Sequence, residues 1–188
     1  MPFRFSATDL PGMLLIEPSV FPDERGFFVE TYKRSEFAAH GITEDFVQAN
    51  QSRSSRGTLR GLHFQNPPQS QAKLIRSLDG KIYDVAVDMR RESPTFGKWQ
   101  GLYLSAENSR MLYVPAGFAH GFCVLSDEAG FLYKCTEVYS PADERGILWN
   151  DPALAIAWPV KTPLLSAKDQ AYKCLADMQQ ELPHYNKP

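Results

Sequence analysis

Hydrophobic residues in this chain gather in short segments of strand character, separated by turn-forming residues such as Asp79-Gly80 and Pro141-Ala142-Asp143. Many short strands at close spacing are typical of a β-sandwich or barrel, and the 12 Gly and 14 Pro suit the corners of a jelly roll. We therefore predict an all-β, jelly-roll sandwich. Its expected strands are Met13–Ile16, Phe27–Tyr32, Phe46–Gln48, Thr58–Gln65, Lys73–Leu78, Lys81–Met89, Gln100–Leu104, Met111–Val114, Gly121–Val124, Phe131–Tyr139 and Ile147–Trp149.

Helix signals are few. Ser35–His40 predicts one or two turns that end at Gly41. A stronger signal begins at Ser166, where an acidic residue, Asp169, follows three positions after a capping serine. The apolar residues that continue this pattern at helical spacing are Ala171, Leu175, Met178 and Leu182. We predict a short C-terminal helix over residues 167–180.

The length of 188 residues fits one domain, residues 1–188, and no linker or internal repeat divides the chain. A hydrophobic content of 43% and an aromatic content of 12% are enough for a core. The net charge of −2 supplies no field that would draw the chain onto nucleic acid or an anionic membrane, and no apolar run reaches the length of a membrane span.

Three widely spaced cysteines, Cys123, Cys135 and Cys174, form neither a disulfide framework nor a CxxC metal knuckle. The N-terminal residues do not have the basic-then-apolar pattern of a signal peptide. We expect a reduced, cytoplasmic protein.

One local charge asymmetry stands out. Residues 46–78 contain no Asp or Glu, and the basic residues there are Arg53, Arg56, Arg60, Lys73 and Arg76. A solvated basic face is the simplest explanation, but hydrogen-bonding groups such as Gln48, Asn50 and His63 share the stretch. A site for a small phosphate-bearing ligand is the alternative, and it is favoured over nucleic acid because no aromatic RNA-binding motif or long basic helix accompanies the charges.

Two histidines lie in apolar surroundings. The run Pro115-Ala116-Gly117-Phe118-Ala119-His120 resembles the second motif of cupins, which commonly bind metal. The first cupin motif needs His-x-His followed by an acid, whereas this chain has His63-Phe64-Gln65 and no acidic residue until Asp79. Such a set would leave a transition metal under-coordinated. We predict a cupin-like fold without a metal.

The chain resembles the dTDP-4-dehydrorhamnose 3,5-epimerase family over nearly its whole length. The matching runs are Phe21–Glu30, Leu59–Gln65, Asp84–Asp88, Pro94–Trp99, Leu104–Asn108, Val114–Phe122 and Leu164–Asp169. The resemblance implies a homodimeric, cofactor-independent, metal-free enzyme. Its implied substrate is a dTDP-linked 4-keto-6-deoxyhexose, dTDP-4-dehydro-6-deoxy-glucose, which is inverted at C3 and C5 to dTDP-4-dehydro-L-rhamnose.

The protons at C3 and C5 of such a sugar are acidic because both carbons adjoin the carbonyl, so inversion needs a base, enolate stabilisation and an acid. Resemblance makes His63 the base, Tyr133 the acid, and Lys73 and Arg60 the positive charges beside the carbonyl. Strict strand alternation would point Arg60 and His63 to opposite faces. A bulge at Gly61 would bring them to one site.

Asp169 has two interpretations. As the third residue of a helix it would cap backbone donors, and resemblance instead makes it the partner that orients His63. Asp84 is the alternative partner of His63, because an acidic residue in an apolar strand needs a hydrogen-bonding mate.

Resemblance also implies a set of residues that bind the substrate. They are Arg25, Glu30, Gln48, Asn50, Arg60, His120, Glu144 and Lys168. Among them, Arg25 and Lys168 suit phosphate, while Glu30 and Gln48 could read the thymine edge.

Three other functions stay open at this point. One is an epimerase that inverts a single centre of a related sugar nucleotide, which would keep His63, Lys73 and Tyr133. The second is a binding module without catalysis, against which the presence of both His63 and Tyr133 argues. The third is a metal-dependent cupin enzyme.

Overall fold

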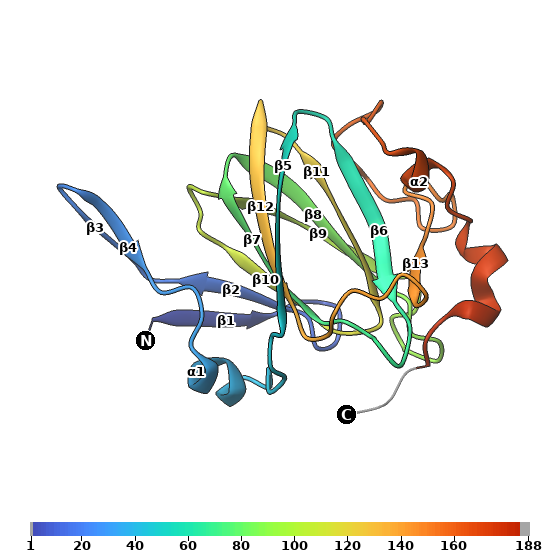
Figure 1. The fold of residues 1–188 in the computed structure, drawn as a ribbon, viewed down its shortest axis with the longest axis horizontal. Coiled ribbons are helices and arrows are strands. Elements are labelled where there is room, and N and C mark those ends of the chain that lie inside the picture. Colours follow the sequence, from blue (N-terminus) through green and yellow to red (C-terminus); the bar gives the residue numbers. More distant parts are fainter. Residues whose placement is uncertain (1, 185–188) are drawn as a thin grey trace.

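Two antiparallel sheets lie face to face in the computed structural model, which describes residues 2–184 (Figure 1). The larger sheet contains, in spatial order, β1 (Phe3–Ala7), β2 (Leu14–Pro18), β10 (Met111–Val114), β7 (Lys73–Asp79), β12 (Glu128–Cys135) and β5 (Gln48–Ser55). The smaller sheet contains β13 (Glu144–Gly146), β6 (Leu59–Gln65), β11 (Phe118–Val124), β8 (Lys81–Asp88) and β9 (Trp99–Ser105). The predicted all-β, cupin-like sandwich is confirmed.

Side chains from the facing surfaces of the two sheets form the central core. It includes Ile75, Leu112 and Phe131 from the larger sheet, and Ile82 and Phe122 from the smaller one. Burial of these apolar surfaces is the main force that holds the sheets together. Two of these core residues, Phe122 and Phe131, also line a cavity between the sheets.

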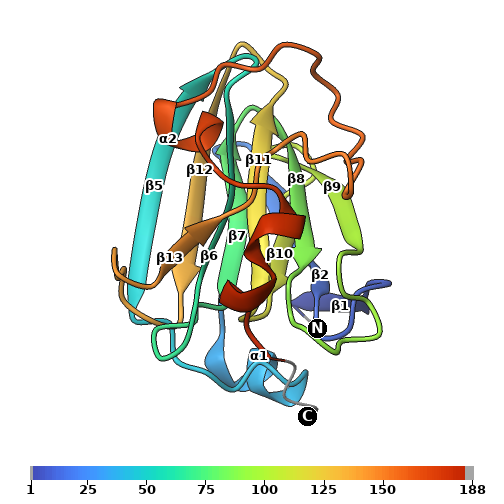
Figure 2. The same ribbon diagram turned by 90° about the vertical axis from the view of Figure 1, so that its right-hand side faces the viewer.

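Each sheet is also covered on its outer face, which explains why strands such as β8 are buried on both sides. The helix α1 (Arg34–Ala39) places Phe37 against the larger sheet, and Gly41, with a φ of +86°, follows it as predicted. The segment of residues 147–184 crosses the outside of the smaller sheet (Figure 2).

The predicted C-terminal helix over residues 167–180 is wrong in one respect, because it is broken in two. The structure has a short α2 (Ala167–Gln170) and a separate 3-10 helix, η1 (Leu175–Glu181). At the break the chain is held by the segment that follows β13: the N–H of Leu148 donates to the carbonyl of Lys173 at 2.9 Å, and a carboxylate oxygen of Asp151 accepts from the N–H of Leu175 at 2.5 Å. These tertiary hydrogen bonds override the helical periodicity, while Leu175 and Met178 still pack against the sheet.

Most expected strands match the structure to within a few residues, and three differ more. Only Phe46–Gln48 was expected where β5 runs from Gln48 to Ser55, because this edge strand is mostly polar and is held by pairing with β12. The strand expected over Phe131–Tyr139 ends earlier, at Cys135. The strand expected over Ile147–Trp149 is not formed, and Ile147 makes only an isolated bridge.

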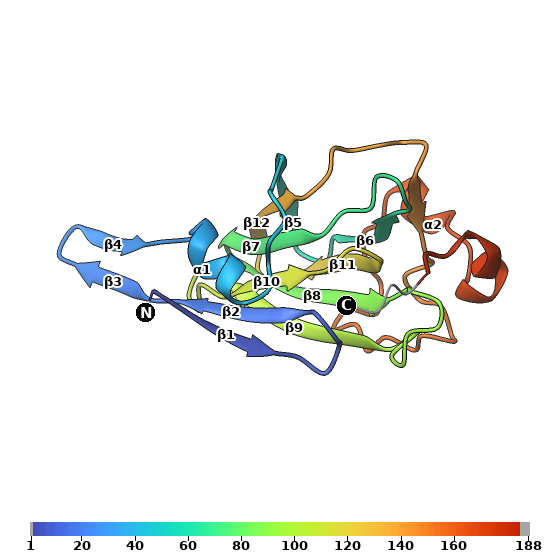
Figure 3. The same cartoon turned by 90° about the horizontal axis from the view of Figure 1, so that it is seen from below.

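A two-stranded hairpin, β3 (Val20–Asp23) and β4 (Gly26–Val29), extends away from the two sheets (Figure 3). Three of its aromatic side chains are largely exposed: Phe21 at 56%, Phe27 at 65% and Phe28 at 68%. The expected strand Phe27–Tyr32 lies partly in this hairpin, and β4 ends at Val29. Exposed aromatic residues on a projecting hairpin are typical of a contact surface.

Candidate active site

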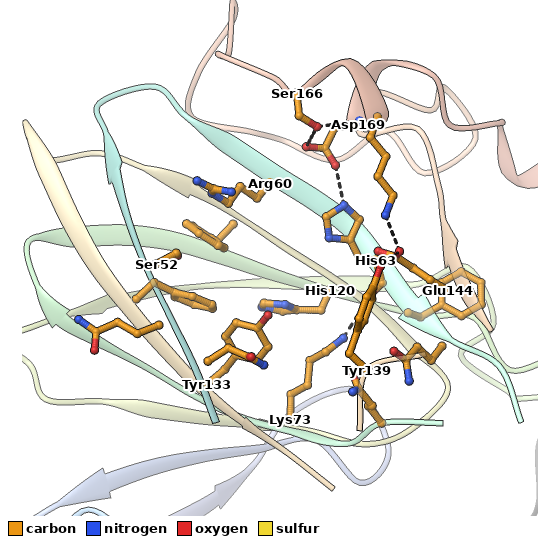
Figure 4. A pocket seen from close by; sticks show the side chains of 18 residues that line it. Ser52, Arg60, His63, Lys73, His120, Tyr133, Tyr139, Glu144, Ser166 and Asp169 are labelled. Atoms are coloured by element: carbon orange, nitrogen blue, oxygen red, sulfur yellow. Dashed lines mark hydrogen bonds and ion pairs between the residues drawn. The ribbon is translucent and has the colours of Figure 1, made fainter. Parts of the chain in front are cut away.

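A cavity of about 350 Å³ opens between the two sheets (Figure 4). Its walls come from β5, β7 and β12 of the larger sheet, from β6, β11 and β13 of the smaller sheet, and from α2. Nine of the twelve predicted site residues line it: His63, Tyr133, Lys73, Asp169, Asn50, Arg60, His120, Glu144 and Lys168. Residues far apart in sequence are thus brought to one place by the facing sheets.

The bulge predicted at Gly61 is confirmed. Pairing between β6 and β11 joins His63 to His120 and Arg60 to Phe122, so β6 holds one more residue than β11 in this interval. Gly61 has a φ of +126°, and a Cβ there would lie 2.5 Å from the Cα of Gly121. The bulge turns Arg60 to the same cavity as His63, where its Nε donates to Ser54 at 3.1 Å.

His63 is paired with Asp169. The His63 Nε2 lies 2.5 Å from Oδ1 of Asp169, while the other ring nitrogen, Nδ1, is on the side toward the cavity (Figure 4). Ionised carboxylates only accept hydrogen bonds, so this contact places the ring proton on Nε2 and leaves Nδ1 able to accept a proton. The side chain of His63 is about one-third exposed, which gives it access to a ligand.

Asp169 also lies at the start of α2, where Ser166 rather than the Asp169 carboxylate accepts from the helix backbone. Ser166 accepts from the backbone N–H of Asp169 at 3.1 Å and donates its hydroxyl proton to Oδ2 at 2.7 Å. Burial raises the pKa of the Asp169 carboxyl, but the hydrogen bonds from His63 and Ser166 outweigh it and hold the pKa below its ordinary value. Ser166 is therefore the cap of α2, and it also holds the Asp169 carboxylate that supplies a negative charge to His63.

Asp84 is not the partner of His63. Its two carboxylate oxygens lie 2.9 and 3.0 Å from Nε2 of His120, and its side chain is fully buried. The alternative pairing fails because Asp84 lies on β8, next to β11, whereas β6 lies on the far side of β11. His120 is therefore held at the inner wall of the cavity by its own carboxylate.

Lys73 and Tyr133 come from the larger sheet and point into the cavity (Figure 4). Lys73 is only 7% exposed, and its Nζ lies 3.4 Å from the carbonyl oxygen of His63. Burial lowers the pKa of the Lys73 ammonium, against the opposing influence of Cys135 and Asp84. Burial also raises the pKa of the Tyr133 phenol, with nearby Arg60 acting in the opposite direction.

At the mouth of the cavity, Glu144 joins two further residues. It forms an ion pair with Lys168 and accepts from the hydroxyl of Tyr139 at 2.7 Å. These contacts lower the pKa of Glu144 despite its partial burial, so its carboxylate stays ionised. The group sets one negative and one positive charge at the entrance.

Three predicted binding residues do not line the cavity. Gln48 lies just beyond it, donating to Asn50 at 3.0 Å and accepting from the backbone N–H of Tyr139 at 2.8 Å. Arg25 is on the projecting hairpin, where it pairs with Asp23, and Glu30 directly follows that hairpin. Within one chain, the structure does not bring Arg25 and Glu30 to the cavity.

Sequence reasoning left some contributors to the site unidentified. The sequence marks Ser166 only as a helix cap, and Tyr139 only as the end of an expected strand. Gln65 binds three backbone groups of neighbouring loops, the carbonyls of Gln69 and Val138 and the N–H of Ser140. No sequence pattern marks such contacts, because they depend on which loops meet at the cavity.

Within residues 2–184, no cluster of three or more His, Cys, Asp or Glu side chains is arranged to hold a metal ion. No helix in that part of the chain is long and apolar enough to cross a membrane.

Comparison with known proteins places this geometry in a family. A family profile described as dTDP-4-dehydrorhamnose 3,5-epimerase matches residues 7–177. A dTDP-4-dehydrorhamnose 3,5-epimerase of Shigella flexneri is 57% identical over 163 residues, covering 86% of this chain and 90% of the relative. A dTDP-4-dehydrorhamnose 3-epimerase of Streptomyces niveus is 42% identical over 175 residues, covering 93% of this chain and 84% of the relative.

A solved structure of an epimerase has a similar fold. The dTDP-6-deoxy-D-glucose-3,5-epimerase of Legionella pneumophila, in complex with dTDP-4-keto-L-rhamnose, superposes with a TM-score of 0.95 at 47% identity, covering 98% of this chain and 100% of that one. The fold, the matched length and the cavity between the sheets point the same way: the chain belongs to the dTDP-4-dehydrorhamnose 3,5-epimerase family.

Proposed function

We propose that the protein inverts C3 and C5 of dTDP-4-dehydro-6-deoxy-glucose, giving dTDP-4-dehydro-L-rhamnose, and that it needs no cofactor. The observation that carries this proposal is the pairing of a carboxylate-bound histidine, His63, with a neutral phenol, Tyr133, on opposite walls of one cavity. A base on one side of a sugar ring and an acid on the other are what inversion of a carbon requires.

Nδ1 of His63 takes the proton from the carbon next to the 4-keto group. The electron pair of the broken C–H bond moves to the carbonyl oxygen and makes an enolate. Asp169 supports this step because its negative charge stabilises the imidazolium that forms.

Lys73 and Arg60 stabilise the enolate. Both are cations that line the cavity, and positive charge in a site shielded from water stabilises a developing oxyanion strongly. The penalty that burial places on the Lys73 ammonium is relieved when a negative oxygen forms beside it.

Tyr133 returns a proton to the opposite face of the carbon. The raised pKa keeps the phenol protonated at neutral pH, so the proton is available when the enolate collapses. Arg60 lies close enough to stabilise the phenolate that remains. Before the second carbon reacts, His63 releases its proton to water and Tyr133 regains one from water. The same groups then serve that carbon once the sugar ring presents it to His63.

The remaining predicted residues fit the nucleotide and diphosphate. Lys168 at the mouth suits a phosphate, and Gln48 and Asn50 present amide groups along the adjoining strand. His120, fixed by Asp84, offers its other ring nitrogen to the sugar.

Incubation of the protein with dTDP-4-dehydro-6-deoxy-glucose in deuterated water tests the proposal. Deuterium at both C3 and C5 of the product supports it. Deuterium at one carbon alone would instead support a single-centre epimerase, the activity named for the Streptomyces niveus relative. No exchange at either carbon would overturn the epimerase assignment for this substrate.

We also infer that the protein is a homodimer in which the hairpin β3–β4 of one protomer reaches the cavity of its partner. The support is the position of Arg25 and Glu30, which match binding positions of the family yet lie on or beside a hairpin that extends from its own chain. The exposed Phe21, Phe27 and Phe28 supply apolar area for a second copy of the chain to cover.

Mixing two inactive variants tests this arrangement. A protein with His63→Ala keeps the hairpin residues, and one with Arg25→Ala keeps the base. If the site forms across two chains, exchange of subunits restores activity, because one site of each mixed dimer has both residues. Absence of recovery after confirmed subunit exchange, or a monomer in sedimentation at micromolar concentration, would contradict the inference.

We infer a cytoplasmic location from the free thiols of Cys123, Cys135 and Cys174. Cell fractionation with activity measurement checks it.

A further inference from the structure

Tyr172 lies against His63 although it does not line the cavity. The two rings meet edge to face, with centroids 5.6 Å apart and planes at 66°. Tyr172 sits in the segment between α2 and η1, where its neighbour Lys173 forms an isolated parallel bridge with Ile147. The backbone on both sides of Tyr172 is thus fixed, by α2 before it and by this bridge after it.

Gly146 makes room for this ring. It is the register partner of His63 across the β13–β6 pair, so a side chain there would project on the same face, next to the imidazole. A Cβ at Gly146 would lie 2.3 to 2.5 Å from three atoms of the Tyr172 ring. The φ of Gly146 is outside the left-handed region, so space rather than backbone conformation calls for glycine at this position.

The ring of Tyr172 therefore occupies the place that a cross-strand neighbour of His63 would normally take. A tyrosine there is larger than most cross-strand partners and is held by a separate segment of chain. It packs against the imidazole from outside the cavity, and Asp169 binds Nε2. Together, Tyr172 and Asp169 restrict the rotation of the His63 ring and favour the orientation in which Nδ1 faces the cavity.

We propose that Tyr172, seated on Gly146, is a positioning residue that holds the imidazole of His63 in its proton-accepting orientation. The inference rests on the proposed function, in which His63 is the base. The ring, rather than the hydroxyl, performs the task. Burial and the negative charge of Glu144 raise the pKa of the Tyr172 phenol to about 12, so the side chain adds no further negative charge beside Asp169.

Activity measurements on four variants test the proposal. We expect Tyr172→Ala to lower kcat by about 10- to 100-fold with little change in KM, since a small misplacement of a reacting group has costs of this order. Tyr172→Phe is the matched control, because it keeps the ring, and it should stay within about 2-fold of the parent. Gly146→Ala should lower kcat like Tyr172→Ala, because the added methyl group displaces the ring.

The double variant Gly146→Ala/Tyr172→Ala separates this mechanism from a general loss of stability. Once the ring is gone, the methyl group has nothing to displace, so the double variant should be no slower than Tyr172→Ala alone. Independent effects would instead multiply. If Tyr172→Ala fails to fold, Tyr172→Phe and Gly146→Ala still test the mechanism. The first keeps the ring in place and should keep kcat, whereas the second displaces the ring and should lower kcat.

Nitrogen-15 NMR of the substrate-free protein observes the imidazole itself. In the parent protein and in Tyr172→Phe, the signals of His63 should report a single tautomer with the proton on Nε2. In Tyr172→Ala and Gly146→Ala, they should shift toward a mixture of states. This readout does not depend on turnover, so a parent protein that fails to exchange deuterium would overturn the proposed function and leave the positioning role testable.

Two results would overturn the inference. One is a folded Tyr172→Ala protein with the parent kcat and unchanged His63 signals. The other is a loss in Tyr172→Phe as large as that in Tyr172→Ala, which would assign the effect to the hydroxyl.

Discussion

Two histidine–carboxylate pairs lie side by side in the smaller sheet, and they are built differently. His63 and His120 are register partners on adjacent strands, and each binds an aspartate through Nε2. The side chains of His63 and Asp169 are 34% and 4% exposed, whereas those of His120 and Asp84 are 8% and 0% exposed. The first pair is at the open side of the cavity and the second is at its buried inner wall.

The sources of the two carboxylates differ as well. Asp84 comes from the adjacent strand β8, so the sheet itself fixes the inner pair. Asp169 lies 106 residues from His63, on a helix of four residues that Ser166 caps. The inner histidine is also stacked on Phe131, with ring planes at 11°. A group that transfers protons needs access to the substrate, which His63 has. The buried pair of His120 and Asp84 instead shapes the cavity wall, and the negative charge of Asp84 partly balances the charge of Lys73.

Substitution of the two histidines should separate these roles most strongly. We expect His63→Asn to lower turnover by about 10⁴-fold, because the base is lost, with the protein still folded. The matched change His120→Asn should lower turnover much less and should reduce thermal stability, since Asp84 loses its partner. Steady-state kinetics and thermal unfolding of both variants check this, and equal losses of turnover would contradict the distinction.

Substitution of the two aspartates should give opposite signatures. Asp169→Asn should lower turnover by about 10³-fold, because an amide no longer holds the base in its working tautomer. Its free energy of unfolding should fall by at most about 1 kcal/mol, as for loss of a helix cap. Asp84→Asn should instead cost about 3 kcal/mol, since it breaks a buried pair.

Acid unfolding adds a second test of Asp169. Its pKa in the folded protein is below the ordinary value of 3.8, so the carboxylate contributes stability above that value and loses it as the pH falls through the folded pKa. The Asp169→Asn protein should therefore lose less stability than the parent between about pH 5 and pH 3. Superimposable acid-unfolding curves would show that the pair contributes nothing to folding.

Lys73 gives a prediction in which stability and activity move in opposite directions. Lys73→Met should lower turnover by about 100-fold, because enolate charge loses its cation. Burial lowers the pKa of this ammonium, so the folded parent is penalised at neutral pH and gains stability as the pH rises toward 10.5. Lys73→Met should be more stable at pH 7 by about 1 kcal/mol, and this gain should disappear near pH 10. A destabilised variant at pH 7 would contradict this.

Removal of divalent ions should have no effect. Both histidines of the cavity already bind carboxylates through Nε2, and we expect the parent turnover after treatment with a chelator. A loss of activity that added metal restores would support the metal-dependent cupin alternative.

Strand patterns in the sequence were sufficient for the sandwich, because they are short-range properties, whereas resemblance to the family supplied most of the cavity residues. The bulge at Gly61 followed from combining strand alternation, which separates Arg60 from His63, with the resemblance, which assigns both to one site. The pairing of each histidine with its aspartate did not follow, since it depends on strand order and on where α2 docks. Resemblance identified Asp169, whereas the pattern of the residues allowed Asp84 equally well.

Features that rest on tertiary contacts were missed for the same reason. The break between α2 and η1 follows from hydrogen bonds to Leu148 and Asp151, which the helical spacing of Leu175 and Met178 does not show. The contact between Tyr172 and Gly146 likewise cannot be predicted from the sequence, because it depends on where the segment after α2 packs.

Deuterium incorporation in the His63→Ala and Tyr133→Phe proteins tests most directly whether one base serves both carbons. After incubation with dTDP-4-dehydro-6-deoxy-glucose in deuterated water, mass spectrometry and NMR locate the label. We expect no deuterium at C3 or C5 with His63→Ala, and exchange with impaired inversion for Tyr133→Phe. Deuterium at either carbon at the parent rate in the His63→Ala protein would show that a different group removes that proton.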